Sequence, residues 1–508
     1  MKKLLTSILM CASLSVAAQE TFENPILRGM NPDPSICRVG DDYYIATSSF
    51  TWSPGMPVYH SRDLVNWQRI CYAMPEGLSL DGLNDNDGIW AVTIRHHNGT
   101  YYLIANAQKC GGNFYMTATD PKGPWSKPVW LTNTTGIDPS IFFDDDGKCY
   151  YTGNRWDFKH SWQGQCAVWI QELDIDNGKL IGERKDIAYG HAANAAYAEG
   201  PHIYKINGKY WLLMAEGGAS YDHAVTALTA SNVMGPYTPC KVNPVITARH
   251  LGHNAGIQDI GHADITDTPD GQWWAVVLGC RMQNALKPIG RETFLCKAEF
   301  EDGNLIINPG EGKVLERMQR PNLPEVKMSV SDDWMWLRTR KAPFHTESNG
   351  EIQLQLLSEV IDSLHTPAYL FKRVTEFDFT FTSQVKFKAK GDNEEAGIAY
   401  YRTANGYFTL MKGKNKIFLT RKDKGKKEII ATADYNKPEV YFKVRVKDCK
   451  AQFSYGDTPE CQNNIGSPMS IAPLSHNKYN KFNGTGIGIY ATAKGKKSKN
   501  TASFKIIK

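Results

Sequence analysis

Three carboxylates and one imidazole lie at matching positions of a short sequence motif that recurs along the first 310 residues. Asp33, Asp138 and Glu199 are each the first residue of one copy of this motif, and His262 is the first residue of another. If the copies fold alike, these side chains meet in one funnel, where neighbouring negative charges drive their pKa values apart. One carboxyl group then keeps its proton while another stays ionised, which allows acid and base chemistry on the same bond.

This pairing suits hydrolysis of a glycosidic bond. An acid protonates the leaving oxygen, while a second carboxylate activates water or attacks the sugar itself. A single Asp-Pro-Ser is a common turn, but three acids at equivalent positions of a repeat favour a shared site. Flat aromatic rings on or just after the repeated elements offer surfaces for a sugar: Phe50, Trp52, Trp90 and Trp156.

The repeat that positions these groups has five copies. They begin at Asp33 (Asp-Pro-Ser-Ile), Trp90 (Trp-Ala-Val-Thr-Ile), Asp138 (Asp-Pro-Ser-Ile), Glu199 (Glu-Gly-Pro-His-Ile) and His262 (His-Ala-Asp-Ile), and are 57, 48, 61 and 63 residues apart. An aromatic pair in an apolar run follows each copy, and four copies have a glycine turn in between. Two β-runs around a turn at this period predict a five-bladed β-propeller. Its inner strands begin near the central axis.

The propeller is expected over residues 24–320, because five such units leave no room for a sixth. The segment 320–324 contains two prolines and is predicted to be a linker. Residues 326–508 show period-two alternation with turns at Asn405-Gly406 and Lys424-Gly425, which predicts an antiparallel β-sandwich. The apolar alternating runs are 377–381, 385–388, 442–446 and 486–490. The fold class is therefore all-β.

Charge also separates the two parts. Residues 326–508 contain 31 Lys and Arg against 18 Asp and Glu, a net charge of +13, so the rest carries −8 within a total of +5. An acidic front part suits neutral or cationic groups, and the basic rear part could contact acidic polymers. Basic residues at alternate positions, such as Lys443, Arg445 and Lys447, favour a solvated sheet face instead. We expect no nucleic-acid partner.

Residues 1–19 have the pattern of a signal peptide. Two lysines precede an apolar stretch from Leu4 to Val16, and small residues end it near Ala18 or Gln19. This pattern predicts export to the periplasm or the extracellular space. No later run reaches the roughly 20 apolar residues that a membrane-spanning helix requires.

Ten cysteines follow the predicted cleavage point, and none forms a Cys-x-x-Cys motif, so no zinc or redox site is expected. Most should be small buried side chains. An oxidising compartment permits disulfides, and Cys449 with Cys461 could close a hairpin. Cys11 fits lipid attachment less well than simple cleavage, because bulky Met10 precedes it.

The motif set resembles glycoside hydrolase family 43, in particular its β-xylosidase and α-L-arabinofuranosidase branch. The resemblance extends from about Asn24 to the C-terminus, and the rear part is similar to the concanavalin-like β-sandwich of that family. The motifs that carry it are Asn31-Pro32-Asp33-Pro34-Ser35-Ile36, Ile137-Asp138-Pro139-Ser140, Glu199-Gly200-Pro201-His202, Gly261-His262-Ala263-Asp264, Gly290-Arg291-Glu292-Thr293-Phe294 and the stretch from Ser48 to Trp67.

The resemblance implies a role for each acid. Asp33 becomes the general base that activates water, Glu199 the general acid, and Asp138 the residue that orients Glu199 and tunes its pKa. The family inverts the anomeric configuration, which requires acid and base carboxyls about 6.5–9.5 Å apart.

The resemblance also implies how the sugar is held. Arg291 would bind sugar hydroxyls, with pairing to Glu292 as its alternative. His262 would lie near the pocket floor. It would be either a buried histidine whose ring nitrogens have hydrogen-bond partners, or a neighbour of a central divalent cation such as calcium, as in some relatives. No cofactor is otherwise required. The pocket walls would be aromatic: Phe50, Trp90 and Trp156.

These expectations describe an exported, inverting exo-glycosidase that removes terminal β-D-xylose or α-L-arabinofuranose from xylan or arabinoxylan fragments. Both pentoses remain candidates, because both activities use the same acids. A retaining five-bladed fructosidase is one alternative, and a propeller that binds glycans without cutting them is another. The unlike residues that open the five copies favour one shared site over repeated binding sites.

Overall fold

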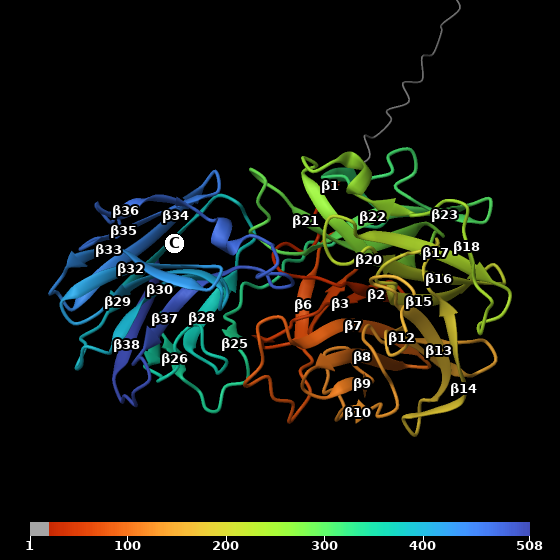
Figure 1. Ribbon diagram of the computed structural model, residues 1–508, viewed down its shortest axis with the longest axis horizontal. Helices are drawn as coiled ribbons and strands as arrows, with labels where there is room; N and C mark the ends of the chain where they lie inside the picture. Colours follow the sequence, from red (N-terminus) through yellow and green to blue (C-terminus); the bar gives the residue numbers. More distant parts are fainter. Residues whose placement is uncertain (1–19, 508) are drawn as a thin grey trace, which may run out of the picture.

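The computed structural model describes residues 20–507, which form two bodies lying side by side (Figure 1). The predicted signal peptide, residues 1–19, lies outside the described residues. The described part consists of strands and two short 3-10 helices, η1 (Arg249–Leu251) and η2 (Ala472–Leu474). It contains no helix that is long and apolar enough to cross a membrane.

The first body is built from antiparallel sheets of successive strands. The first sheet contains β2 (Ser35–Val39), β3 (Asp42–Ala46), β5 (Pro57–Ser61) and β6 (Gln68–Tyr72). The second contains β7 (Gly88–His97), β8 (Thr100–Gln108), β9 (Gly112–Ala118) and β10 (Val129–Trp130). The third contains β11 (Ser140–Phe143), β12 (Cys149–Arg155), β13 (Ala167–Asp174) and β14 (Lys179–Ala188).

Two more sheets complete this body. The fourth contains β15 (Glu199–Ile206), β16 (Lys209–Glu216), β17 (Ala224–Ala230), β18 (Thr238–Pro239) and β19 (Ile246–Thr247). The fifth contains β20 (Ile257–Asp267), β21 (Trp273–Arg281), β22 (Glu292–Glu301) and β23 (Asn304–Ile307). The first strands contact one another in the cyclic order β2, β7, β11, β15, β20 and back to β2. The predicted propeller is therefore confirmed, with the first strand of each sheet around the axis.

The second strand of each sheet shows why the sheets pack into a ring. In β8, the neighbours Leu103 and Ile104 are both fully buried but point to opposite faces. Leu103 packs with residues of the first sheet and Ile104 with residues of the third. Each blade is thus covered on both sides, which is why its central strands are apolar at successive positions instead of alternating.

A small additional sheet joins the two ends of the propeller. Strand β1 (Thr21–Glu23) pairs with β24 (Arg317–Gln319). Phe22 and Met318 of these strands pack in one cluster with Tyr43 of the first blade and Val276 of the fifth. The ring is therefore closed by contacts between its first and last blades.

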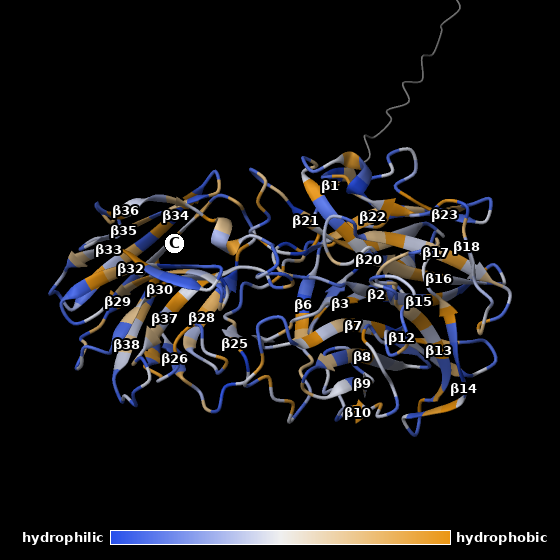
Figure 2. Ribbon diagram, viewed as in Figure 1, coloured by the Kyte–Doolittle hydropathy of each residue, from blue (hydrophilic) through white to orange (hydrophobic). Residues whose placement is uncertain are grey.

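The second body is a sandwich of two antiparallel sheets, as predicted. The seven-stranded sheet has the order β26 (His345–Ser348), β27 (Glu351–Gln355), β38 (Thr501–Ile507), β29 (Phe379–Lys386), β34 (Glu439–Lys447), β35 (Lys450–Gly456), β36 (Asn463–Ser470). The six-stranded sheet has the order β28 (Ala368–Arg373), β37 (Gly486–Thr492), β30 (Glu395–Thr403), β31 (Gly406–Lys412), β32 (Lys416–Asp423), β33 (Lys426–Asp434). Hydrophobic and hydrophilic residues alternate along strands such as β34 (Figure 2).

Two details of the sandwich differ from the sequence prediction. The runs 377–381 and 385–388 belong largely to the single strand β29, because no turn separates them. Cys449 and Cys461 do not form a disulfide, and all ten cysteines of residues 20–507 are free thiols. The Cys449 thiol instead donates to the carbonyl oxygen of Gln283 in the propeller, at 3.4 Å.

The two bodies share a buried interface. Strand β4 (Trp52–Ser53) of the propeller pairs with β25 (Trp336–Leu337), which leads into the sandwich. Next to it, the Asp85 carboxylate accepts hydrogen bonds from Arg338 at 3.1 Å and from the Tyr401 hydroxyl at 2.9 Å. Arg338 is fully buried, so its charge depends on Asp85 for compensation. This interface holds the sandwich in a fixed position beside the propeller axis.

Candidate active site

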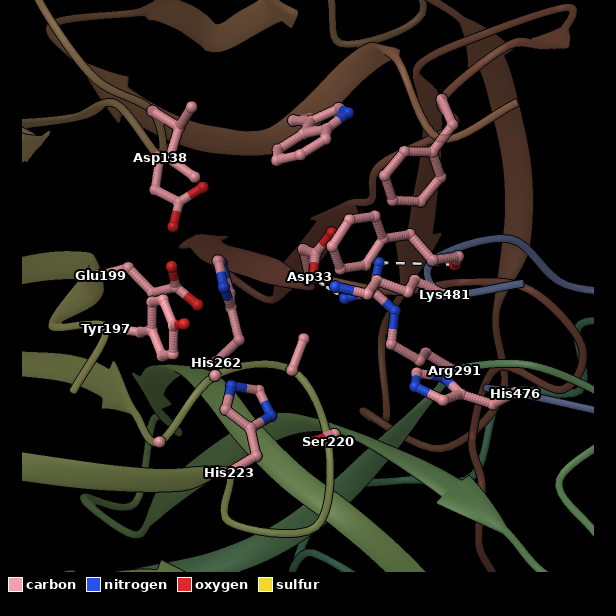
Figure 3. Close-up of a pocket in the computed structure, with 17 residues that line it drawn as sticks. Asp33, Asp138, Tyr197, Glu199, Ser220, His223, His262, Arg291, His476 and Lys481 are labelled. Atoms are coloured by element: carbon pink, nitrogen blue, oxygen red, sulfur yellow. Dashed lines mark hydrogen bonds and ion pairs between the residues drawn. The ribbon is translucent and has the colours of Figure 1, made fainter. Parts of the chain in front are cut away.

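The residues that open the five repeats meet in one cavity of about 340 Å³. The structure therefore brings together side chains that are far apart in the sequence, and Figure 3 shows the three carboxylates facing a common space. The five residues that begin the repeat copies all line the cavity: Asp33, Trp90, Asp138, Glu199 and His262.

The backbone directs these side chains toward the axis. Asp33 and Asp138, which lie two residues before their inner strands, have the same left-handed φ of 54°, and His262 has a φ of 47°. Non-glycine residues rarely adopt this conformation, and it is retained where the surrounding structure enforces it. The pairing of β15 is also irregular between Glu199 and His202. A bulge of this kind re-aims a side chain.

Asp33 is held in its ionised form. Its carboxylate accepts hydrogen bonds from Arg291 at 2.9 Å and from the Ser48 hydroxyl at 2.6 Å. Burial opposes ionisation, but Arg291, His262 and Ser48 together outweigh it and lower the pKa of Asp33 below its ordinary value. Asp33 is thus a carboxylate able to accept a proton.

Glu199 has the opposite character. Burial raises its pKa well above the ordinary value, and the negative charges of Asp138 and Asp33 raise it further. Asp138 accepts a hydrogen bond from the backbone N–H of Gly200 at 2.9 Å. Burial raises the pKa of Asp138 to about 6, and the negative charge of Asp138, where it is ionised, favours retention of the Glu199 proton.

His262 packs between these groups. Its ring lies against Gly200, where a Cβ atom would come within 3.0 Å of the imidazole. Gly200 also has a φ of 58°, so both its conformation and this contact require glycine. The close packing of His262 keeps the imidazole near Asp33 and Asp138.

Arg291 pairs with Asp33 instead of Glu292, which is bound by Arg281 at 2.7 Å. The Arg291 guanidinium lies 5.4 Å from the Phe50 ring centroid and 5.2 Å from that of Phe482. Two aromatic rings and one carboxylate therefore fix the guanidinium against the cavity wall.

The predicted aromatic wall is present only in part. Phe50 and Trp90 line the cavity, but Trp156 does not, because its side chain lies on the surface with 45% exposure. The strand before Trp156 ends at Arg155, so Trp156 lies in the loop that follows it. Trp52 is buried in the interface between the bodies, against Phe371, and is also absent from the cavity.

Several cavity residues were not identified from the sequence. His476, Lys481 and Phe482 come from the segment between η2 and β37 of the sandwich, and Phe482 stacks on Phe50 at 6.0 Å between centroids. No local pattern marks these three residues. Tyr197 also lines the cavity, and its place two residues before Glu199 could have identified it.

A different group of side chains in the described structure could hold a cation. Within residues 20–507, one group of three His, Cys, Asp or Glu side chains has ligand atoms close enough to share an ion: Asp259, Cys280 and His476. Lys287 already binds both oxygens of Asp259, at 2.7 and 2.8 Å. His262 does not belong to this group, and a divalent cation beside His262 stays a prediction.

The propeller holds three carboxyl groups in one axial cavity, where the pKa values of Asp33 and Glu199 are shifted in opposite directions. This is the architecture of a glycoside hydrolase. The family model for Glycosyl hydrolases family 43 matches residues 22–305. The model for the Beta xylosidase C-terminal Concanavalin A-like domain matches residues 327–508. The chain belongs to glycoside hydrolase family 43.

Known relatives cover nearly the whole chain. A xylosidase/arabinosidase of Butyrivibrio fibrisolvens is 35% identical over 95% of this chain and 98% of its own. A non-reducing end α-L-arabinofuranosidase of Bacteroides ovatus is 34% identical over 96% of this chain and 94% of its own. The solved structure of a xylan β-1,4-xylosidase from Bacillus halodurans has a TM-score of 0.88 at 29% identity, covering 96% of this chain and 100% of that one.

Proposed function

We propose that the protein is an exported, inverting exo-glycosidase that removes terminal β-D-xylose or α-L-arabinofuranose from xylan or arabinoxylan fragments. The observation that carries this proposal is the opposite pKa shift of Asp33 and Glu199 in one cavity. The names of the relatives, xylosidase/arabinosidase and arabinofuranosidase, support the choice of pentose substrates. Export rests on the signal pattern of residues 1–19 and places the enzyme in the periplasm or outside the cell.

The shape of the cavity favours cleavage at a chain end. Arg291 and the sandwich residues Lys481 and Phe482 border one side of the cavity, where Phe50 and Phe482 stack. A cavity of about 340 Å³ with one side bordered in this way suits a terminal sugar better than the middle of a long chain.

The proposed reaction assigns one proton transfer to each of two carboxyl groups. Asp33 removes a proton from water as the water oxygen attacks the anomeric carbon, and Glu199 donates its proton to the leaving oxygen. One C–O bond forms as another breaks, and the configuration inverts. Asp33 ends protonated and Glu199 ionised, and proton exchange with solvent restores both. Arg291 holds Asp33 in place and, in the proposal, binds sugar hydroxyls.

Asp138 should set the alkaline limit of activity. The Asp138→Asn variant removes a negative charge that raises the pKa of Glu199, so Glu199 should lose its proton at lower pH. We expect the alkaline limb of the kcat/KM profile to move to lower pH, measured on an oligosaccharide across the pH range. An alkaline limb that stays in place would show that Asp138 does not tune the acid.

The stereochemistry of the first product tests the proposed function. We expect proton NMR, recorded within the first minutes of hydrolysis of a β-xyloside, to show the α-anomer of xylose before mutarotation. Initial appearance of the β-anomer would favour the retaining fructosidase-like alternative. Binding of oligosaccharides without release of a pentose would favour the glycan-binding propeller.

A further inference from the structure

We propose that Tyr197 is the platform on which the first sugar of the leaving group stacks, so that this ring helps to select which glycosides are cut. The inference rests on the proposed function for the identity of Glu199 as the acid. It adds a binding residue on the leaving-group side of the cavity.

The location of Tyr197 fits this role. Its ring lies beside Glu199, across the cavity from Arg291, Lys481 and His476 (Figure 3). The acid delivers its proton to the oxygen of the leaving group, so the sugar beyond that oxygen must lie on the Glu199 side. A residue beside the acid is therefore positioned to contact the sugar that departs.

The exposure of Tyr197 separates it from the groups that face the sugar to be released. Tyr197 is 43% exposed, whereas Asp33 and Asp138 are each 7% exposed. A large aromatic surface is thus left open to solvent at the outer part of the cavity, where a flat ring can cover it.

The chain holds this exposed ring in a defined position. Tyr197 has a φ of 56°, which is unusual for an aromatic residue and has to be enforced by its surroundings. Its N–H donates to the carbonyl oxygen of Gly164 at 2.7 Å. The N–H of Gly217 donates to the carbonyl oxygen of the preceding Ala196 at 2.8 Å. Two other loops of the propeller therefore fix the backbone next to the acid.

Glycines make room for the ring itself. A Cβ atom at Gly218 would lie 3.0 Å from Cδ2 of Tyr197, and one at Gly164 would lie 3.3 Å from its ring carbons. Both glycines also have positive φ values, 73° and 78°. The ring thus rests against two positions that carry no side chain, which helps to hold it in place before binding and reduces the entropy lost on binding.

The experiment compares three substrates that carry the same pentosyl group. The disaccharide xylobiose needs both the acid and a contact for its leaving sugar. The 2,4-dinitrophenyl xyloside places a ring on the leaving-group side but needs little protonation. Xylosyl fluoride has no ring to stack and a good leaving group. For an enzyme that prefers arabinofuranose, the corresponding arabinofuranosyl compounds serve.

We expect Tyr197→Ala to lower kcat/KM about five- to ten-fold for xylobiose and for the dinitrophenyl xyloside, and less than two-fold for the fluoride. Tyr197→Phe should retain the wild-type values, because the ring face and not the hydroxyl makes the contact. Gly218→Ala should reproduce the pattern of Tyr197→Ala by displacing the ring. Tyr189 is also 43% exposed and lies outside the cavity, so Tyr189→Ala is the matched control and should change none of the three.

Three outcomes would overturn the inference. A loss confined to xylobiose would show that Tyr197 acts through Glu199, and an equal loss on all three substrates would show a general disturbance of the site. Unchanged kinetics would show that the ring makes no contact. If the wild-type enzyme cleaves none of the three, the proposed function fails instead, which is a separate result.

Discussion

Glu199→Gln is expected to fold normally and to lose about 10²–10⁴-fold in kcat for natural oligosaccharides. Glutamine has nearly the same shape as glutamic acid but cannot donate the acidic proton that the leaving oxygen requires. The raised pKa of Glu199 favours retention of this proton in the native enzyme. Steady-state kinetics on xylo- or arabino-oligosaccharides measure the loss.

The loss should depend on the leaving group. A dinitrophenolate leaves without protonation, so the same variant should keep most of its activity on the dinitrophenyl glycoside. Glu172→Gln is a suitable control, because Glu172 forms a surface pair with Lys148 and lies outside the cavity. Full activity of Glu199→Gln on natural oligosaccharides would show that another group is the acid.

Asp33→Asn should abolish hydrolysis of every substrate, whatever its leaving group. The amide cannot accept the proton from the attacking water, and a better leaving group does not replace this step. We expect a loss of about 10²–10⁴-fold or more on both oligosaccharides and dinitrophenyl glycosides. The contrast with Glu199→Gln is the informative comparison, because it separates activation of water from departure of the sugar.

This variant also removes the charge partner of Arg291, which is 3% exposed. An unpaired buried guanidinium destabilises a fold, so the midpoint of thermal unfolding should be recorded with the kinetics. Asp267→Asn is the matched control, because Asp267 pairs with Arg38 at a partly exposed position. A folded Asp33→Asn variant that still cleaves dinitrophenyl glycosides at the wild-type rate would exclude Asp33 as the base.

The fold was predictable because a motif that recurs five times indicates five similar antiparallel sheets. Each copy of the motif and the aromatic pair after it form the first two strands of a sheet, such as β2 and β3, and this pairing of first and second strands returns in all five sheets. The sandwich was predictable from alternation, with Val440, Phe442, Val444 and Val446 buried in β34. Strand ends were less predictable, because the runs at 377–381 and 385–388 contain no signal that distinguishes one strand from two.

The site was predictable where it follows the repeat. Equivalent positions in equivalent blades must face the same axis, which is how Asp33, Asp138, Glu199 and His262 could be grouped. Trp156 does not line the cavity because it follows its strand, in a loop whose direction the repeat does not determine.

Phe482 was missed for a related reason. Its approach to Phe50 spans more than four hundred residues and depends on how the sandwich docks. The docking contacts, such as Asp85 with Arg338, have no signature in the sequence of either partner.

Phe50 and Phe482 both pack against the Arg291 guanidinium, and this contact has a consequence for how the active site is assembled. One ring belongs to the first blade and the other lies 432 residues later in the sequence, so the site is finished only when the sandwich has docked on the propeller. A fragment that ends in the segment after Arg320 retains all three acids but lacks the wall that covers them. Loss of the docked sandwich would therefore open one side of the cavity without altering any of the three acids.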